Sequence, residues 1–345
     1  MRAVLFRRHG GPDVLESADV PDPSLEPGRI LVRVKACSIN HLDLWIRQGL
    51  PAYHITLPHI SGCDVAGVVE QTGPGVTGVP VGSPVVIAPG VSCFHCAACF
   101  AGQDNLCESY GIFGAKTNGG YAQFTTARAR DVVPVPAGLS MDAAAAFPLV
   151  FLTAWHMLIT RAQLRAGETV LIHAAGSGIG HAAVQIAKLS GATVIATVGS
   201  DPKIGKAQAL GADHVINYQR EDFVAGVRRL TQDQGVDVVF EHIGPQTWDG
   251  SLKLVKKGGR LVTCGATSGP GVPLDLRYVF SRQLTILGAM MGTRAELLAV
   301  AGLMGQGRLR PVVDTVYPLQ EVRTAQERML GRDVFGKLVL QPPAA

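Results

Sequence analysis

The sequence predicts an α/β protein that joins a β-barrel-like domain to a doubly wound parallel sheet. About the first 130 residues are dense in short β-type runs separated by Gly and Pro, such as Ile30 to Ala36, Val65 to Glu70 and Val85 to Ala88. From about Ala143 onwards, alanine-rich helical patterns alternate with compact apolar strands, the pattern of βαβ units. After Pro311 the chain is β-rich again, so we expect it to return to the first domain and complete it.

Composition limits the class of protein. A chain of 345 residues with 47% hydrophobic and 17% charged residues has room for about two domains with full cores. The formal net charge is only +4 and no basic run is present, so neither nucleic acid nor an anionic membrane is an expected partner. The most apolar stretch, Ala143 to Ile159, contains Pro148 and falls short of the roughly 20 apolar residues of a membrane span. No targeting segment is recognisable, and we therefore expect a cytoplasmic protein.

Four cysteines gather in one short stretch within residues 90–110. Cys93, Cys96, Cys99 and Cys107 are separated by two, two and seven residues. This spacing lets four thiolates surround one centre, and Zn²⁺ is suited to a closed tetrahedron of four sulfurs. A disulfide cluster, an iron–sulfur site and thiols that are merely buried are the alternatives. One structural Zn²⁺ per chain is the favoured interpretation, because nothing indicates an oxidising compartment and a ferredoxin-type run has a tighter last spacing.

A small-residue turn in the second half predicts a dinucleotide site. The strand Thr169 to His173 leads into Ala175, Gly176, Ser177, Gly178, Ile179 and Gly180, and a helix is expected to begin near His181. Small residues let the backbone approach a pyrophosphate, and the amides and positive end of the helix attract its charge. Ala175 and Ser177 replace the first two glycines of a strict GxGxxG, so the turn by itself is also compatible with simple strand–helix packing.

The end of the following strand bears on the choice of nicotinamide cofactor. An NAD site usually places an acid there for the ribose diol, whereas this chain reads Gly199, Ser200, Asp201, Pro202, Lys203. Ser200 and Lys203 offer a hydrogen bond and a cation to a 2′-phosphate, which favours NADP(H). Asp201 can take the diol role if the turn shifts by one residue, so NAD(H) stays open. Ile243 and Gly265, just after the strands Val236 to Glu241 and Gly259 to Cys264, complete the expected cofactor contacts.

The whole chain resembles the medium-chain dehydrogenase/reductase superfamily, which includes zinc-binding alcohol dehydrogenases and quinone oxidoreductases. The resemblance rests on the four-cysteine loop, the AGSGIG turn and four further segments: VKACSINHLDLWIRQG, LPHISGCDVAGVVEQTGPGV, KAQALGADHVINY and VVFEHIG. It implies a GroES-like catalytic domain, residues 1–150 with 291–345, and a Rossmann cofactor domain, residues 151–290. It also implies hydride transfer at the nicotinamide, in a cleft between the two domains, by a homodimer or homotetramer.

The resemblance has informative departures at the catalytic zinc. Zinc alcohol dehydrogenases hold this metal with a Cys–His–Ser/Thr segment, a Gly–His–Glu segment and a third ligand near the start of the cofactor domain. The corresponding places here read Asn40-His41-Leu42, Gly62-Cys63-Asp64 and Leu149. Only Cys63 keeps a metal-binding atom at a ligand place, which disfavours the zinc mechanism. An irregular metal site rebuilt from His41, His59, Cys63 and Asp64 stays open.

The segment Asn40, Asp43, Arg47 and Gly49 is similar to the NxxDxxxRxG segment of zinc-independent quinone oxidoreductases and enoyl reductases. Those enzymes pass hydride to a double bond conjugated with a carbonyl, and the developing enolate needs hydrogen-bond donors and a proton source. We assign carbonyl orientation to Asn40, and proton donation or pocket lining to Tyr53.

The expected function is therefore an NAD(P)H-dependent reductase of a quinone, enal or enone that uses no catalytic zinc. The first alternative is a zinc-type alcohol dehydrogenase, which would hold two zinc ions per chain. The alternative from another class is a non-catalytic NADPH-binding protein with a structural or sensing role.

Overall fold

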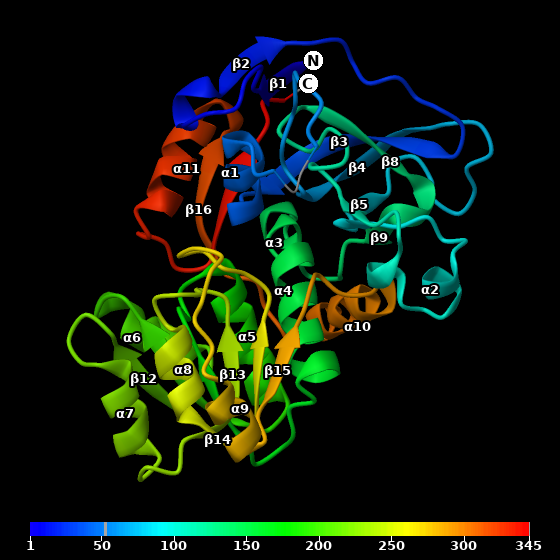
Figure 1. Ribbon diagram of the computed structural model, residues 1–345. Helices are drawn as coiled ribbons and strands as arrows, with labels where there is room; N and C mark the ends of the chain where they lie inside the picture. The colour runs from blue at the N-terminus through cyan, green and yellow to red at the C-terminus, as the bar shows by residue number, and fades with distance from the viewer. Residues whose placement is uncertain (52–53, 345) are drawn as a thin grey trace. The chain divides into compact units, whose positions relative to one another are not determined.

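The computed structural model describes residues 1–51 and 54–344, and the chain divides into two compact units. The first unit contains Met1–Leu149 and Thr293–Ala345, and the second contains Val150–Gly292. Figure 1 shows the first and last parts of the chain, in blue and red, together in the first unit.

The first unit is built on a seven-stranded sheet with the order β16-β17-β3-β4-β5-β9, in which β8 also pairs with β3. The strands are β3 (Arg29–Ser38), β4 (Asp64–Thr72), β5 (Pro84–Ile87), β8 (Phe124–Arg128), β9 (Val132–Pro134), β16 (Val313–Pro318) and β17 (Lys337–Gln341). Two small hairpin sheets pair β1 (Arg2–Leu5) with β2 (Glu16–Asp19), and β6 (Gly90–Val91) with β7 (Gly111–Ile112).

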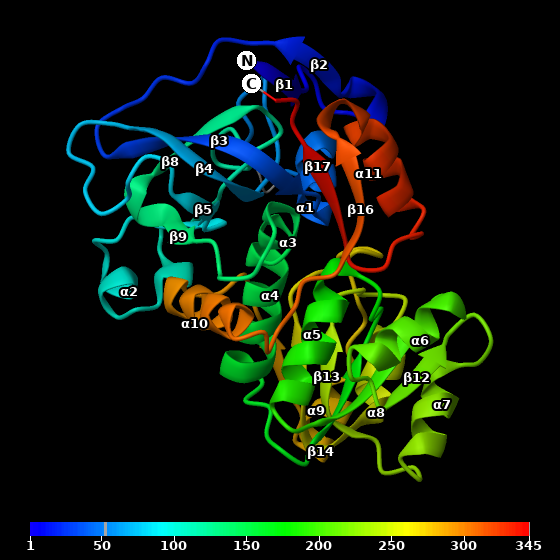
Figure 2. The same ribbon diagram turned by 180° about the vertical axis from the view of Figure 1, so that it is seen from behind.

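The C-terminal return is completed by β17, which pairs antiparallel with β3 through Val339 and Ser38 and parallel with β16. Figure 2 shows β16 and β17 side by side near α1. The β-rich tail therefore finishes the first sheet, as the sequence predicts. The helices of this unit are α1 (His41–Gln48), α2 (Ala97–Phe100), α3 (Met141–Ala145), α10 (Arg294–Gly305) and α11 (Val322–Leu330).

The second unit is a six-stranded parallel sheet with the order β12-β11-β10-β13-β14-β15. The strands are β10 (Thr169–Ile172), β11 (Thr193–Val198), β12 (His214–Asn217), β13 (Val236–Glu241), β14 (Val255–Thr263) and β15 (Thr285–Gly288). The chain builds outward from β10 through β11 and β12, then crosses to the other side of β10 and continues through β13 to β15. This doubly wound order confirms the predicted fold class and creates a switch point between β10 and β13.

Helices cover both faces of this sheet. They are α5 (Gly178–Leu189), α6 (Pro202–Ala209), α7 (Phe223–Leu230), α8 (Trp248–Leu254) and α9 (Leu276–Arg282). Figure 1 shows α8 and α9 in front of the strands, and Figure 2 shows α5 in front from the opposite side. Leu171, Ile195, Val239 and Leu261 on neighbouring strands pack with α8 in one buried cluster. Because helices cover both faces of the sheet, the side chains on both faces of its strands are buried, which explains why these strands are apolar throughout.

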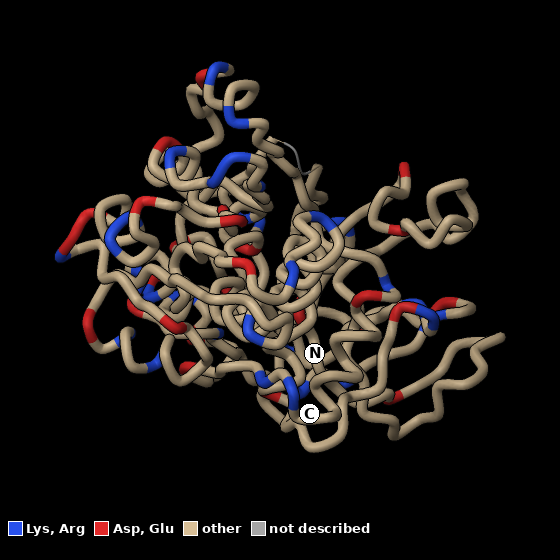
Figure 3. The backbone as a smooth tube through the Cα atoms, turned by 90° about the horizontal axis from the view of Figure 1, so that it is seen from below, with Lys and Arg blue, Asp and Glu red and all other residues tan. Residues whose placement is uncertain are grey.

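The apolar segment that precedes β10 folds as short helices. It contains α3, α4 (Pro148–Trp155) and a wider helical turn over His156–Arg161. Within the described residues, no helix combines the length and the apolar character needed to cross a membrane. Figure 3 shows Lys and Arg interspersed with Asp and Glu along the backbone, in keeping with the small net charge of +4.

Candidate functional site: a cofactor turn, a four-cysteine centre and a buried lysine cluster

The four cysteines of the first unit come together as the sequence predicts. All four Sγ atoms lie within 4.8 Å of one another, and those of Cys93 and Cys99 are 3.9 Å apart. A tetrahedral Zn²⁺ with Zn–S bonds of about 2.3 Å requires sulfur–sulfur distances of about 3.8 Å. Backbone amides already point at the sulfurs, since Cys93 N donates to Cys107 Sγ at 3.3 Å and His95 N donates to Cys93 Sγ at 3.5 Å. The donor set and its geometry fit a structural zinc.

The cysteine loop is fixed to the rest of its unit by contacts on two sides. The guanidinium groups of Arg130 and Arg128 lie 4.6 and 5.5 Å from the ring centre of Phe94, within the range of cation–π attraction. On the other side, the Asp104 carboxylate accepts a hydrogen bond of 3.0 Å from Arg294 N at the start of α10. The loop therefore links the barrel to the helix with which the chain re-enters this unit.

In the second unit the small-residue turn lies at the carboxyl end of β10, where a doubly wound sheet binds its ligand. The helix begins at Gly178, earlier than the predicted start near His181, because Ser177 caps it by accepting from Gly180 N at 2.9 Å. A Cβ atom on Gly180 would lie 2.1 Å from the carbonyl oxygen of Ala174, so the close approach of helix and strand requires glycine. Ala175, Gly176 and Ile179 belong to the same turn and first helical turn.

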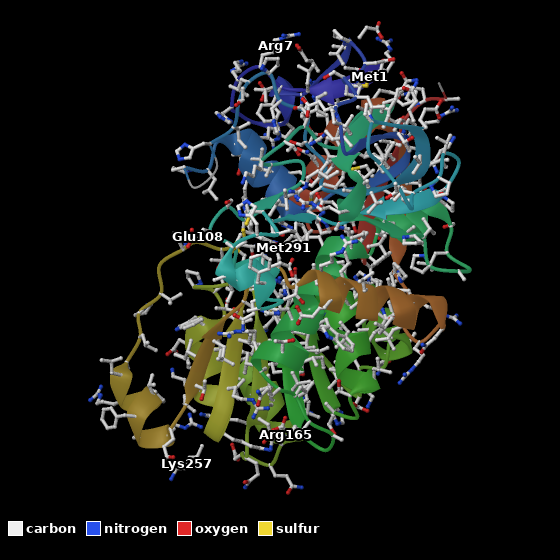
Figure 4. The ribbon with its side chains drawn as sticks, turned by 90° about the vertical axis from the view of Figure 1, so that its right-hand side faces the viewer. Met1, Arg7, Glu108, Arg165, Lys257 and Met291 are labelled. Atoms are coloured by element: carbon white, nitrogen blue, oxygen red, sulfur yellow. The ribbon has the colours of Figure 1, made fainter. Side chains whose placement is uncertain are left out.

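Two further residues expected to contact the cofactor, Ile243 and Gly265, lie at the same edge of the sheet. Figure 4 labels Met291, which follows β15, at one end of the sheet, and Arg165 and Lys257 at the opposite, amino end. Ile243 and Gly265 follow β13 and β14 at their carboxyl ends. The amide of Ile243 donates to Glu241 Oε1 at 2.7 Å, and the carbonyl of Gly265 accepts from Thr263 Oγ1 at 3.2 Å.

After β11, Asp201 is occupied by protein partners. Its carboxylate accepts a hydrogen bond of 2.7 Å from Asn217 Nδ2 and forms an ion pair with Arg220. Gly199 faces Tyr218, whose hydroxyl would lie 2.4 Å from an added Cβ. Ser200 precedes helix α6, and Lys203 lies in its first turn. The shift that would offer Asp201 to a ribose diol is therefore opposed by two hydrogen-bond donors.

Asn40 lies in a buried polar cluster of the first unit. Its Nδ2 donates to Asp64 Oδ2 at 2.8 Å and approaches Cys63 Sγ at 3.3 Å, while its Oδ1 accepts from Lys337 Nζ at 2.5 Å. Lys337 Nζ also lies 3.3 Å from Asp64 Oδ2, and both side chains are almost wholly buried. Ser38 Oγ and the amide of Leu149 donate to the same carboxylate. A cation is thus already built into the cluster, supplied by the chain itself.

The residues considered for a rebuilt catalytic metal site are not assembled as a ligand set. His59 Nε2 bonds to the carbonyl of Gly114 at 2.9 Å, and burial lowers the pKa of its imidazole. His41 begins the exposed face of α1. Within residues 1–51 and 54–344, the four-cysteine group is the sole cluster of three or more His, Cys, Asp or Glu side chains arranged to hold a metal. Tyr53 lies outside the described residues.

Sequence reasoning missed Lys337, Arg220 and the buried Glu241. Lys337 meets Asn40 from 297 positions away, and its signal is only a lysine inside the apolar run GKLVLQ. Glu241 ends an apolar strand in the segment VVFEHIG, and an acid at a strand end gives no sequence signal of burial.

The combination in one chain of a β-rich unit with a four-sulfur centre and a doubly wound sheet with a glycine-rich turn defines a dinucleotide-dependent dehydrogenase. Residues 26–137 match the model of the alcohol dehydrogenase GroES-like domain, and residues 178–305 match that of the zinc-binding dehydrogenases. The chain is 33% identical to an alcohol dehydrogenase of Geobacillus stearothermophilus over 343 residues, 99% of each chain. It is 30% identical to a quinone oxidoreductase of Rattus norvegicus over 350 residues, 99% of this chain and 97% of the relative.

A crystal structure described as an NAD-dependent alcohol dehydrogenase superimposes with a TM-score of 0.95 at 46% identity, covering 99% of each chain. The protein therefore belongs to the medium-chain dehydrogenase/reductase superfamily and is an NAD(P)-dependent oxidoreductase of that type.

Proposed function

We propose that this protein is an NADP(H)-dependent reductase of quinones or α,β-unsaturated carbonyl compounds, with one structural Zn²⁺ and no catalytic metal. The observation that carries the proposal is the ammonium of Lys337 among Asn40 and Asp64. Asn40, Cys63 and Asp64 stand at the places of metal-binding segments in zinc alcohol dehydrogenases. Lys337 already neutralises the charge of Asp64, so no carboxylate charge is left to compensate a divalent cation at this point. The ammonium group would also repel such a cation.

The nicotinamide, when bound, supplies the hydride, and a conjugated β-carbon accepts it without a Lewis acid. The enolate oxygen then needs hydrogen-bond donors. Asn40 is proposed to supply one of them. Its contact with Cys63 Sγ, at 3.3 Å, is the weaker of its two donations, because a thiol sulfur is a poor acceptor. A carbonyl oxygen would compete for that hydrogen, while the bond to Asp64 keeps the amide oriented. Tyr53 remains the proposed proton donor or pocket wall.

NADP(H) is proposed over NAD(H) because of what surrounds Asp201. Arg220 and Asn217 bind its carboxylate, whereas Ser200, Lys203 and Arg220 bring a hydroxyl and two cations to the loop after β11. A hydroxyl and two cations stabilise the 2′-phosphate of NADP(H), whereas the uncharged ribose diol of NAD(H) interacts with them only weakly. The structural neighbour at 46% identity is described as NAD-dependent, so the two cofactors must be compared directly.

Alcohol dehydrogenase activity is the second candidate, and the names of two similar proteins support it. The relative at 33% identity and the neighbour at 46% identity both bear that name. On this alternative the cluster around Cys63 would exchange Lys337 for a metal, and the protein would hold two zinc ions per chain.

We further propose that residues 1–150 with 291–345 carry the substrate contacts and residues 151–290 the cofactor contacts. A homodimer or homotetramer is the proposed assembly, and β15 is an edge strand with one neighbour in its sheet. Size-exclusion chromatography with light scattering tests this part separately.

The deciding experiment measures zinc per chain in the purified protein and NADPH and NADH oxidation with a quinone, an enone and an aldehyde. One zinc, with turnover of quinone or enone and a higher kcat/KM for NADPH, is the expected result. Two zincs with aldehyde reduction would overturn the metal-free reductase in favour of the alcohol dehydrogenase. Dinucleotide binding without turnover of any acceptor would reject both substrate assignments.

A further inference from the structure

A chain of buried polar groups runs through the second unit from Glu241 to the cofactor turn. Glu241 ends β13 with no solvent exposure. Its Oε1 accepts the backbone amides of His242, Ile243 and Gly244 at 2.9, 2.7 and 3.2 Å. The loop that carries Ile243, an expected cofactor contact, is therefore folded around this carboxylate.

The second carboxylate oxygen starts a path in the other direction. Ser251, on α8, donates from its hydroxyl to Glu241 Oε2 at 2.9 Å and lies 2.9 Å from His173 Nε2. The other ring nitrogen of His173, Nδ1, lies 3.3 Å from Thr197 Oγ1. Thr197 Oγ1 in turn accepts the amide of Ala174 at 3.0 Å.

Donors and acceptors along this path assign one direction to every bond. Since Ser251 gives its hydrogen to Glu241, its oxygen accepts from His173 Nε2–H. In a neutral imidazole that carries its proton on Nε2, Nδ1 is an acceptor, so the hydroxyl of Thr197 donates to it while its oxygen accepts from Ala174. A neutral His173 in the Nε2–H form satisfies both ends, and burial lowers the pKa of His173 to about 4, in agreement with that form.

Ala174 is the residue whose conformation this path fixes. It adopts φ of +49°, a left-handed conformation that costs a non-glycine residue about 1 kcal/mol or more. It opens the turn to Gly178, and its carbonyl oxygen is the atom against which Gly180 packs. A second link joins the same loops, since His242 Nε2 bonds to the carbonyl of His173 at 3.0 Å.

We infer that Glu241, Ser251, His173 and Thr197 form a positioning relay that sets the pyrophosphate turn and the Ile243 loop in one geometry for the dinucleotide. All four side chains are buried, and we assign them a positioning role. The relay acts by holding the backbone amides of two loops where the cofactor needs them, so that binding requires no reorganisation. The inference rests on the proposed cofactor turn.

The test compares the NADPH dissociation constants of matched variants by fluorescence titration. Thr197→Val removes the hydroxyl that holds Ala174, and Thr197→Ser restores it. Ser251→Ala breaks the relay on α8, away from the turn. Ser190→Ala is the control, because among the described residues its hydroxyl bonds only to the Ile186 carbonyl, at the C-terminal end of α5. We expect the dissociation constant to rise about tenfold in Thr197→Val and Ser251→Ala, about 1.4 kcal/mol, and to stay within about twofold in the other two.

If these residues act by positioning, the KM for NADPH rises in the variants while kcat at saturating NADPH stays within about twofold. A loss of folded protein would instead lower the apparent kcat and leave KM unchanged. Wild-type affinity in Ser251→Ala overturns the relay, even if Thr197→Val binds weakly. If Ser251→Ala fails to fold, Glu241→Gln replaces it, with the same expected loss of affinity and the same overturning result. A wild type that binds NADPH but reduces no acceptor rejects the proposed function and leaves this binding test intact.

Discussion

The ammonium of Lys337 lies 2.5 Å from the side-chain oxygen of Asn40, although the two residues are 297 positions apart. The contact is made because β17 pairs with β3, which brings the C-terminal strand beside the start of α1. It closes a buried cluster in which one lysine compensates Asp64.

Replacing Lys337 by Met is expected to lower the free energy of unfolding by about 3 to 5 kcal/mol, because Asp64 is left buried without its cation. The control is Lys256→Met, which removes a partly exposed pair with Asp237 and is expected to cost less than about 1 kcal/mol. Urea denaturation of both variants measures the difference. Equal stabilities would mean that the cluster does not depend on the lysine charge.

The cofactor turn offers a matched pair of glycines. Gly180→Ala forces a Cβ to within 2.1 Å of the Ala174 carbonyl oxygen, whereas an added Cβ on Gly205, in α6, meets no described atom within 4 Å apart from its chain neighbours and its own helix backbone. The first variant is expected to lose about 2 kcal/mol of stability and most of its NADPH affinity. The second is expected to gain about 0.5 to 1 kcal/mol, because alanine favours the helix. Thermal unfolding and cofactor titration test both, and an unaffected Gly180→Ala would contradict the close helix–strand packing.

Cofactor choice is testable at Arg220. Arg220→Ala removes the cation that pairs with Asp201 and leaves Asn217 as the remaining partner of that carboxylate. The KM for NADPH is expected to rise about tenfold, whereas that for NADH stays constant or falls, because Asp201 loses its ion pair and competes less poorly for the ribose diol. Arg229→Ala, which breaks the surface pair with Glu221, is the control. A parallel rise of both KM values would point to a general loss of cofactor binding and against a 2′-phosphate contact.

The zinc assignment predicts a local loss. Cys96→Ser removes one of four ligands, so zinc per chain is expected to fall from one to near zero and the melting temperature by about 5 °C or more. NADPH affinity should change less than about twofold, since the cysteines belong to the first unit. Cys264→Ser, outside the cluster, should retain its zinc. A Cys96→Ser protein as thermostable as its parent would argue that the loop does not depend on metal.

The parallel sheet and the four-cysteine loop were predictable because their signals are local. Apolar strands such as Val194 to Val198 alternate with helices, and four thiols occur within one loop. The polar clusters were not predictable in this way. Lys337 meets Asp64 across 273 positions, and His173 meets Ser251, the hydroxyl that links it to Glu241, across 78 positions. Long-range pairs of this kind depend on strand order, which the sequence pattern leaves open between several arrangements.

The contrast between local signals and long-range pairs also applies to the partners of Asp201 and Asn40. Their sequence neighbours indicated what each side chain offers, a carboxylate and an amide. The partners that bind these two groups, Arg220 at Asp201 and Lys337 at Asn40, lie outside the motifs.

The pH dependence of stability provides the last prediction. Burial lowers the pKa of His173 to about 4, below the value near 6.5 of an unfolded chain. Between these two pH values the unfolded state binds a proton at His173 and the folded state does not. The stability that neutral His173 contributes is therefore complete above about pH 6.5 and is lost as the pH falls towards 4. Asp43 acts in the opposite sense, because burial raises its pKa to about 6. Burial also lowers the pKa values of His59 and His242, so the bulk pH profile mixes several effects.

His173→Gln isolates the contribution of His173, because it leaves the other groups in place. The difference in melting temperature between wild type and this variant is expected to be largest at pH 7 to 8 and to shrink steadily by pH 5. Calorimetry of both proteins across that range measures it. A difference that stays constant with pH would mean that His173 titrates normally in the folded protein, and the neutral form that joins Ser251 to Thr197 would have to be abandoned.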